Sequence, residues 1–422
     1  MRKNSLLSGS ATYLVSNILN AAVPLALLPI LTRYLTREQY GEVAMFQALL
    51  AVLGAVTGLS ATGAAGRKYY DADLSQEELK FFIGSCFQIL LVSGILVFVV
   101  LAAFQGSLSQ WIGLHSRWIL PAFATAAASF AIQIRMGQWQ VSKNALSYAL
   151  LQVMQSVTNA LLSLILVVFF LQAESGRIWA QVVTSLVFAC IALLSLHKDK
   201  LLGFAWRPRH LEEALKFGLP LIPHTLGVLV LSLFDRFMIN TELGLAEVGI
   251  YMVAVQLASA MGLLFDAINK AFVPWLFEHL KRDQLDEKQK IVRLTYCYFL
   301  IALLVAGMAF LVGPFAVRLI AGDRYAAAGE AIGWLALGQA FVGMYLMVTN
   351  YIFYSKKTGL LALVTASSGL LNMVALLLLI NHFGLVGAAM ASALAMAARF
   401  LLTWWVAQKS HPMPWLSLNA LA

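Results

Sequence analysis

The stretch Leu25–Gln47, LALLPILTRYLTREQYGEVAMFQ, ends one apolar segment, makes a short polar turn and begins another. A similar arrangement returns at Leu231–Gln256, LSLFDRFMINTELGLAEVGIYMVAVQ, where another arginine closes an apolar run. The two arginines, Arg33 and Arg236, are 203 residues apart in a chain of 422. The sequence therefore predicts two copies of one unit, each with an arginine near the end of its first apolar segment.

The composition is that of a membrane protein. Hydrophobic residues make up 61% of the chain and charged residues 12%, with a mean hydropathy of +0.80. Soluble domains are roughly half apolar and about a quarter charged, so the excess apolar surface must be covered by lipid. The three cysteines each lie inside an apolar run, and no disulfide framework can be read from them. We predict an all-α membrane protein.

Apolar runs long enough to cross a bilayer, about 20 residues each, recur along the whole chain. We predict twelve spans, at 8–32, 40–65, 81–105, 118–138, 146–171, 177–196, 216–239, 246–270, 292–316, 328–353, 359–380 and 384–407. The intervening loops are short. Residues 271–291 combine leucines with charges, which indicates either a helical extension at the membrane interface or a solvated helix end.

The distribution of Lys and Arg orients these spans. With the N-terminus in the cytoplasm, the inside segments hold twenty of the 29 basic residues and the outside segments hold six. This positive-inside bias predicts that both termini are cytoplasmic. The net charge of +9 follows from this topology, and base-stacking modules are absent, so we do not expect nucleic-acid binding.

The repeat extends beyond the two arginines. Ser142-Lys143 and Ser355-Lys356 each precede a later span and are 213 residues apart. Six spans in each half make the repeats parallel, with a central cavity between the halves. We expect an N-terminal half at 1–196, a cytoplasmic linker at 197–215 and a C-terminal half at 216–422.

Several motifs resemble the polysaccharide biosynthesis protein family. They are Leu28–Thr36 followed by Gln39-Tyr40-Gly41, then Gly63–Arg67, and in the second half Asp235-Arg236-Phe237 with Val248-Gly249-Ile250-Tyr251. The resemblance covers the whole chain in length and span number. It implies a Wzx-type O-antigen flippase of the multidrug/oligosaccharidyl-lipid/polysaccharide exporter superfamily. Such a protein moves undecaprenyl-pyrophosphate-linked sugar units from the cytoplasmic to the periplasmic leaflet of the bacterial inner membrane, for lipopolysaccharide or other surface polysaccharide biosynthesis.

Cationic side chains in or at the ends of spans are the candidate substrate-binding residues. An ionisable group inside a span costs roughly 2.5–3.5 kcal/mol on insertion scales and usually faces a cavity or a partner. The planar fork of arginine can hold two phosphate oxygens. The candidates for binding the pyrophosphate are Arg33, Arg67, Arg135, Arg236, Lys270 and Arg399. For those at span ends, the alternative is that the side chain anchors its helix in the head-group layer.

Two carboxylates are candidates for coupling transport to H⁺ or Na⁺. Asp266 lies inside the eighth span, four residues before Lys270 and on the same helical face, a spacing that also suits a structural ion pair. Asp235 precedes Arg236, but adjacent residues on a helix point about 100° apart, so Asp235 could instead meet Arg33 across the halves.

Three classes of function are compatible with a polytopic chain. A lipid-linked oligosaccharide flippase fits the mostly positive in-span charges. A cation- or drug-coupled antiporter of the same superfamily is the alternative, although the first span, Ser8–Thr32, holds no acidic residue. A glycosyl polymerase would need a large outside loop, and none is present.

We expect no enzyme activity, no cofactor and no metal. The expected partners are the lipid-linked oligosaccharide, membrane lipids and, as a further hypothesis, the polysaccharide polymerase machinery.

Overall fold

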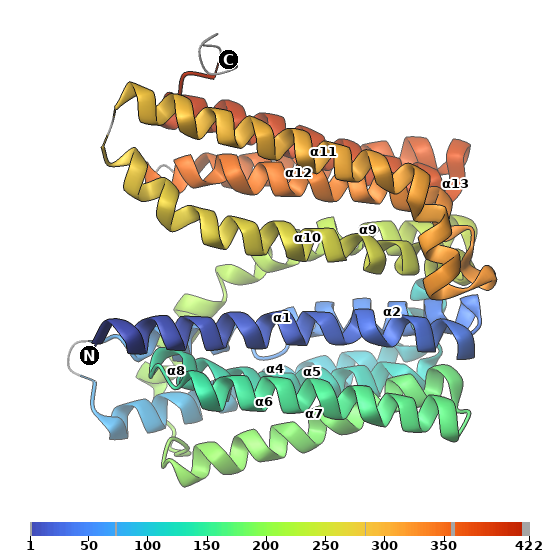
Figure 1. Cartoon of the computed structure of the whole chain (residues 1–422). Coiled ribbons are helices and arrows are strands. Elements are labelled where there is room, and N and C mark those ends of the chain that lie inside the picture. The colour runs from blue at the N-terminus through green and yellow to red at the C-terminus, as the bar shows by residue number, and fades with distance from the viewer. Residues whose placement is uncertain (1, 72–73, 283, 356–358, 416–422) are drawn as a thin grey trace. The chain divides into compact units, whose positions relative to one another are not determined.

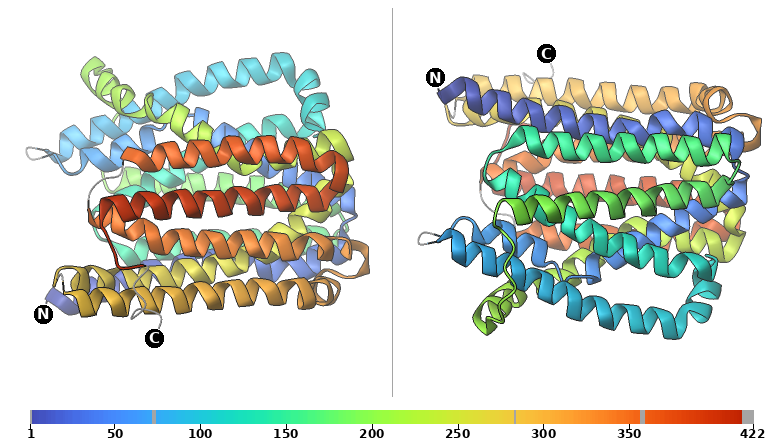
Figure 2. Two further views of the ribbon diagram at one scale, coloured as in Figure 1. Left: turned by 90° about the horizontal axis from the view of Figure 1, so that it is seen from above. Right: turned by 90° about the horizontal axis from the view of Figure 1, so that it is seen from below.

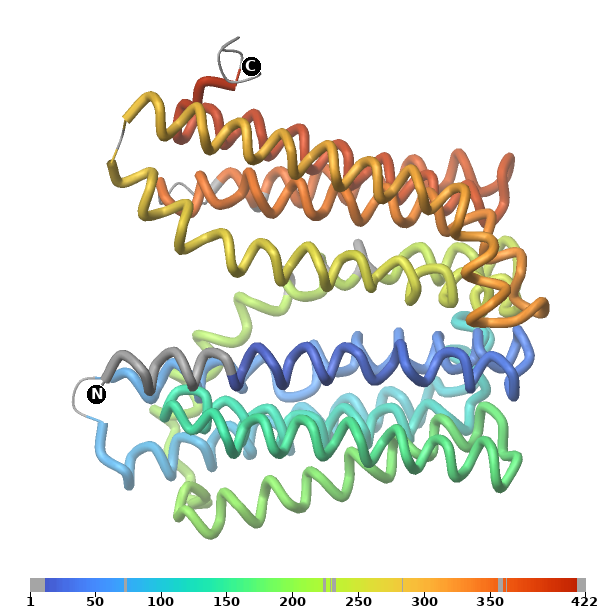
Figure 3. The backbone as a smooth tube through the Cα atoms, in the orientation of Figure 1, coloured from blue at the N-terminus to red at the C-terminus, as the bar shows by residue number. Residues whose placement is uncertain are grey.

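The computed structural model describes residues 2–71, 74–282, 284–355 and 359–415, and Figure 3 traces the backbone through them. Side chains are described in the same ranges, apart from 2–11, 223–224, 228, 230–232 and 362. The chain forms two compact units, Met1–Arg236 and Phe237–Ala422. Each is a bundle of helices, and the described residues contain no strand.

The first unit is built from long apolar helices that run side by side (Figure 1). It contains α1 (Arg2–Tyr34), α2 (Arg37–Val56), α3 (Ala61–Lys68), α4 (Gln76–Ile112), α5 (Ile119–Val141), α6 (Ala145–Leu164), α7 (Ala173–Lys198) and α8 (Pro208–Gly218). A short 3₁₀ turn, η1 (Ser116–Trp118), precedes α5, and a π-helical turn, η2 (Ile165–Phe169), continues α6.

The turn between α1 and α2 is fixed by a capping box. The Thr36 hydroxyl accepts a hydrogen bond from the backbone N–H of Gln39, and the Gln39 side chain accepts one from the N–H of Thr36. Two backbone donors that α2 would otherwise leave unsatisfied are paired in this way. The motif Thr36-Arg37-Glu38-Gln39 thus determines where the second span begins.

The span predicted at 40–65 is interrupted in the structure. Helix α2 ends at Val56, and the chain passes through positive φ angles at Gly58, Leu59 and Ser60 before α3 begins. The Gly58 N–H donates to the hydroxyl of Ser93 at 3.0 Å, and a Cβ at position 58 would lie 2.3 Å from the ring of Phe130. Only glycine fits both the backbone conformation and the space here.

The second unit repeats the same order of elements. Helix α9 (Leu221–Leu243) crosses the boundary between the units, and α10 (Leu245–Leu280), α11 (Leu285–Ala321), α12 (Ala328–Tyr354) and α13 (Gly359–Ser410) follow. The 3₁₀ turn η3 (Asp323–Tyr325) stands between α11 and α12, as η1 stands between α4 and α5. Helices α4 and α11 are both 37 residues long. This correspondence confirms the repeat.

Residues 271–291, which the sequence left open, continue the two flanking helices. Helix α10 runs to Leu280 and α11 starts at Leu285. Leu276 and Leu280 are fully buried in the core of the second unit, whereas Leu285 is exposed. The segment therefore extends the two helices, and Leu276 and Leu280 pack against protein. At 1.5 Å per residue the 36 residues of α10 exceed the roughly 30 Å of a bilayer core.

Ten of the described helices are long and apolar enough to cross a membrane. Helix α13 is counted once among them but contains two spans, because the chain bends at Gly384, and the 23-residue α9 supplies another. These additions give the twelve spans that the sequence predicts. Only 22% of the most apolar window of α4 or α11 is buried, which leaves their leucine, valine and phenylalanine side chains for lipid. The chain is an all-α, multi-pass membrane protein.

Gly384 allows the last two spans to fold back on each other, as Figure 2 shows for α13. Its φ of 54° and ψ of −131° form a conformation that L residues avoid. We expect Gly384→Ala to lower the free energy of unfolding by about 1–3 kcal/mol. Gly307→Ala in α11, where a Cβ meets no atom within 4 Å, is the matched control and should be neutral or stabilising. Equal thermal unfolding of the two variants in detergent would contradict this role for Gly384.

Candidate functional site

The two arginines of the repeated turn lie at different depths in their helices. Arg33 is in the last turn of α1, and its side chain is exposed. Arg236 is half-buried in α9, where its backbone N–H donates to the Asp235 carboxylate at 2.8 Å. Among the described residues, neither guanidinium forms an ion pair with a carboxylate. Binding of substrate by this pair stays a prediction.

At the end of α3 the buried cation is Lys68, whereas the predicted Arg67 is exposed. The Lys68 ammonium lies 2.9 Å from Asp71, 3.0 Å from Glu213 and 3.4 Å from Glu78. These carboxylates come from the loop after α3, from α8 and from α4. Arg67 was named from the sequence and Lys68 was missed, because neighbouring positions on a helix point about 100° apart and only tertiary packing shows which of the two is buried.

Charge and burial set the pKa values in this ion-pair cluster. Burial lowers the pKa of Lys68, but hydrogen bonds to Asp71 and Glu213 outweigh it and raise the pKa above its usual value. The hydrogen bond from Lys68 lowers the pKa of Asp71. The pairing is therefore present above the usual pKa of Asp, 3.8, and is lost as the pH falls below it. It is fully present below the usual pKa of Lys, 10.5, and is lost as the pH rises through the raised pKa of Lys68.

We expect Lys68→Met to loosen the docking of α8, because three carboxylates would lose their cation. Hydrogen bonds to charged groups contribute about 1.5–3 kcal/mol, and the partial exposure of these carboxylates reduces the expected loss to about 1 kcal/mol. Hydrogen exchange of the amides in residues 208–218 should become faster. Lys216→Met removes an exposed pair with Glu212 on the same helix and should change this exchange little. Unchanged exchange in Lys68→Met would show that apolar contacts alone hold α8.

Arg135 is buried inside the first unit and is committed to neighbouring groups. Its side chain is 2% exposed, pairs with Asp199 at the end of α7 and lies 4.1 Å from the centre of the Trp139 ring. Removing one partner of a buried ion pair is costly, so this arrangement favours a structural role. It connects α5 to the segment that leads into α8.

Arg399 is the deepest of the predicted cations in the second unit. It is half-buried in α13 and donates to the hydroxyl of Tyr345 on α12 at 3.1 Å, with its guanidinium 4.1 Å from the centre of the Tyr345 ring. Its Nε is buried without a partner among the described residues. A tyrosine neutralises no charge, so Arg399 keeps its capacity to bind an anion.

Asp266 and Lys270 form the ion pair that their spacing predicts, at 2.6 Å on α10. Both side chains are about half exposed, at 44% and 52%. On the same face, the Asn350 amide of α12 donates to Asn269 at 2.8 Å. Asp266, Asn269 and Lys270 thus form one polar stripe on α10, which Asn350 of α12 contacts. Coupling of an ion at Asp266 or Asp235 stays a prediction.

Sequence reasoning missed Arg177, which was counted as an outside loop charge. It lies in α7, is 8% exposed, and donates to Asn159 at 2.7 Å and to Ser163 at 2.8 Å. Glu42 was missed as well. It is buried in α2 and lies 2.5 Å from the ring of His115. Both residues lie about one turn from the start of their helices. The sequence pattern does not show whether a side chain at such a position is buried in the protein or exposed.

A polar cavity of about 310 Å³ opens among α1, α5 and α6 of the first unit. We call it the amide cavity, because five amide and two hydroxyl side chains line it. Its lining is Asn20, Ser129, Ile132, Gln133, Met136, Gln152, Gln155, Ser156 and Asn159. None of these side chains is charged, and all three helices are membrane spans. The sequence offered no signal for it, since no charged residue marks the position.

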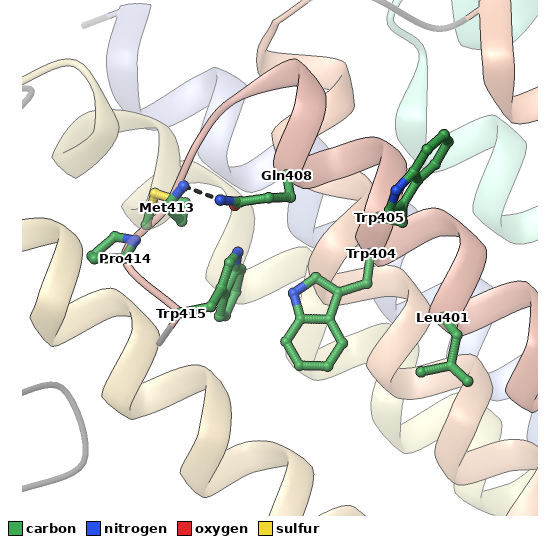
Figure 4. Close-up of a pocket in the computed structure, with 7 residues that line it drawn as sticks. All are labelled: Leu401, Trp404, Trp405, Gln408, Met413, Pro414 and Trp415. Atoms are coloured by element: carbon green, nitrogen blue, oxygen red, sulfur yellow. Dashed lines mark hydrogen bonds between the residues drawn. The ribbon is translucent and has the colours of Figure 1, made fainter. Parts of the chain in front are cut away.

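An aromatic cavity of about 490 Å³ lies at the C-terminal end of α13 (Figure 4). Its lining is Leu401, Trp404, Trp405, Gln408, Met413, Pro414 and Trp415. The Gln408 side chain accepts a hydrogen bond from the N–H of Met413, which holds the chain after α13 against the tryptophans. Tryptophan is enriched at membrane interfaces, and the three tryptophans at this end of the second unit match that pattern. No described group of three or more His, Cys, Asp and Glu residues could hold a metal ion.

Comparisons with known proteins point to one family. A model described as "Polysaccharide biosynthesis protein" matches residues 6–280. "Lsg locus putative protein 1" of Haemophilus influenzae is 25% identical over 90% of this chain and 94% of its own length. "Probable low-salt glycan biosynthesis flippase Agl15" of Haloferax volcanii is 20% identical over 94% and 82%. "Putative O-antigen transporter" of Shigella flexneri is 23% identical over 56% and 55%.

Solved structures show the same fold. A structure titled "Lipid II flippase MurJ, inward closed conformation" covers 95% of this chain with 87% of its own, at a TM-score of 0.74 and 14% identity. At that identity the likeness concerns the fold alone. It agrees with the twelve spans and the repeat described above.

Proposed function

Because the chain belongs to the polysaccharide biosynthesis protein family, we propose that it is a flippase for undecaprenyl-pyrophosphate-linked oligosaccharide, the repeat unit of O-antigen or a related surface polysaccharide. It moves this lipid from the cytoplasmic to the periplasmic leaflet of the inner membrane by alternating access. The relatives named as a glycan biosynthesis flippase and an O-antigen transporter support this proposal. Both ends of the chain are cytoplasmic in this account, as the distribution of basic residues predicts.

The observation that carries the proposal is Arg399, a cation in a span that has no carboxylate partner among the described residues and donates to the hydroxyl of Tyr345. The first span also contains no acidic residue. A pyrophosphate is the anion that such sites suit, because guanidinium groups hold phosphate oxygens in pairs. In the predicted topology the head group meets Arg67 and Lys270 first, then Arg399, and finally Arg33 and Arg236. The attraction must stay modest at each step, because tight binding would prevent release.

The arginines Arg33 and Arg236 give the most direct test in cells. We expect Arg33→Ala with Arg236→Ala to abolish surface polysaccharide at unchanged protein level, because both lose their phosphate fork. Arg→Lys at the two positions should also reduce the amount of surface polysaccharide severalfold, since lysine binds phosphate as a point charge and cannot hold two phosphate oxygens as arginine does. The measurement is the surface polysaccharide displayed by a strain that depends on this protein.

Arg318→Ala is the matched control. Arg318 is an exposed arginine in the last turn of α11, at a predicted outside position, and it should be dispensable if it only anchors its helix. Normal display in the double Ala variant would remove Arg33 and Arg236 from the transport path. An equal loss in Arg318→Ala would reduce all three to anchors.

The alternative is an antiporter driven by cations, and Asp266 is the observation that favours it. Its carboxylate is half exposed within α10, although Lys270 pairs with it. If an ion binds there, Asp266→Asn should abolish the response of transport to a pH or sodium gradient, whereas Lys270→Gln should keep it. If the pair is structural, both variants should lose thermal stability to a similar extent. A stable Asp266→Asn protein with a normal gradient response would exclude Asp266 from coupling.

A further inference from the structure

The amide cavity contains hydrogen-bonding groups that the protein leaves open. Among the described residues, the side chains of Asn20, Gln133 and Gln155 make no hydrogen bond. Gln152 donates to Asn17 at 3.1 Å, but its own carbonyl oxygen is buried without a partner. Each free amide presents two donors and one acceptor. A cavity inside membrane spans rarely carries so many polar groups without a function.

Arg177 of α7 orients Asn159, one of the lining residues of the amide cavity. The Oδ1 of Asn159 accepts a hydrogen bond from Arg177 at 2.7 Å, and Arg177 also binds Ser163. This network turns the asparagine with its oxygen toward α7, so its NH₂ group remains for the cavity. The nearest cation on α5, Arg135, is committed to Asp199. The interior of the cavity is therefore polar and carries no formal charge.

We propose that the amide cavity binds a neutral sugar residue of the lipid-linked cargo, an inference that rests on the proposed function and adds its glycan subsite. Sugar hydroxyls both donate and accept hydrogen bonds, as the open amides do. A pyrophosphate would need cations, which the cavity lacks. The two ends of the substrate thus bind to different groups, the pyrophosphate to arginines and the sugar to amides.

The size of the cavity limits what it holds. Its volume of about 310 Å³ lies at the lower end of the roughly 300–1,000 Å³ typical of ligand sites. This volume has room for about one sugar residue. Aromatic side chains follow along the same helices, where the rings of Tyr13 and Tyr148 meet edge to face at 5.0 Å and the Tyr13 hydroxyl donates to the backbone of Trp139.

Binding of two probes tests the subsite. The probes are undecaprenyl pyrophosphate and the undecaprenyl-pyrophosphate-linked oligosaccharide extracted from the host, each titrated into the purified full chain in nanodiscs. We expect wild type to bind the glycosylated lipid more tightly than the bare lipid. Gln133→Leu with Gln152→Leu should weaken only the glycosylated lipid, by about 2- to 10-fold for each hydrogen bond lost. Binding of the bare lipid should not change.

The matched control is Gln181→Leu, which removes a half-buried glutamine of the same unit outside the cavity, where it bonds Gln47. It should keep the preference for the glycosylated lipid. If the double Leu variant does not fold, Ser156→Ala replaces it, and a smaller loss of the same preference is expected. A preference that survives every cavity variant would overturn the subsite. Equal binding of both lipids by wild type would overturn the subsite alone, and binding of neither would overturn the proposed function as well.

Discussion

The structure depends on the high cost of placing a charged or hydrogen-bonding group in the hydrocarbon of a bilayer. In the first unit, buried cations offset this cost by ion pairs and hydrogen bonds to other side chains of the protein. Arg135 is paired with Asp199, Lys68 with three carboxylates and Arg177 with Asn159 and Ser163. Carboxylates neutralise Arg135 and Lys68, whereas Arg177 is held by two uncharged groups. All three sets of contacts join different helices or the segments that follow them, so the interactions that satisfy the cations also assemble the bundle.

Groups that the protein leaves unpaired stand out against this background. Among the described residues, Arg399 has Tyr345 and no carboxylate as its side-chain partner, and several amides of the amide cavity make no hydrogen bond. One group is cationic and the other is neutral. A lipid-linked oligosaccharide has the same two parts, an anionic pyrophosphate and a sugar rich in hydroxyls. The proposed function and the glycan subsite follow from this correspondence, since each part of the cargo meets groups of matching chemistry.

Most of the fold could be predicted from the sequence, because hydrophobic runs, loop charges and a repeated turn are properties of local sequence. The capping residues at Thr36 and Gln39 mark a helix start in the same local way. The break at Gly58 could not be predicted, because it depends on the close approach of Phe130 from a distant helix. The site was harder still. Arg177 and Lys68 are buried by tertiary packing, and the amide cavity is formed by uncharged side chains from three helices.

The most direct measurement is translocation of the host's lipid-linked oligosaccharide in proteoliposomes that contain the purified protein, beside a fluorescent phospholipid in the same vesicles. The account predicts that the lipid-linked oligosaccharide crosses the bilayer faster than in protein-free vesicles, while the phospholipid does not. Translocation of neither lipid, or of both at equal rates, would contradict a flippase that recognises its cargo by pyrophosphate and sugar.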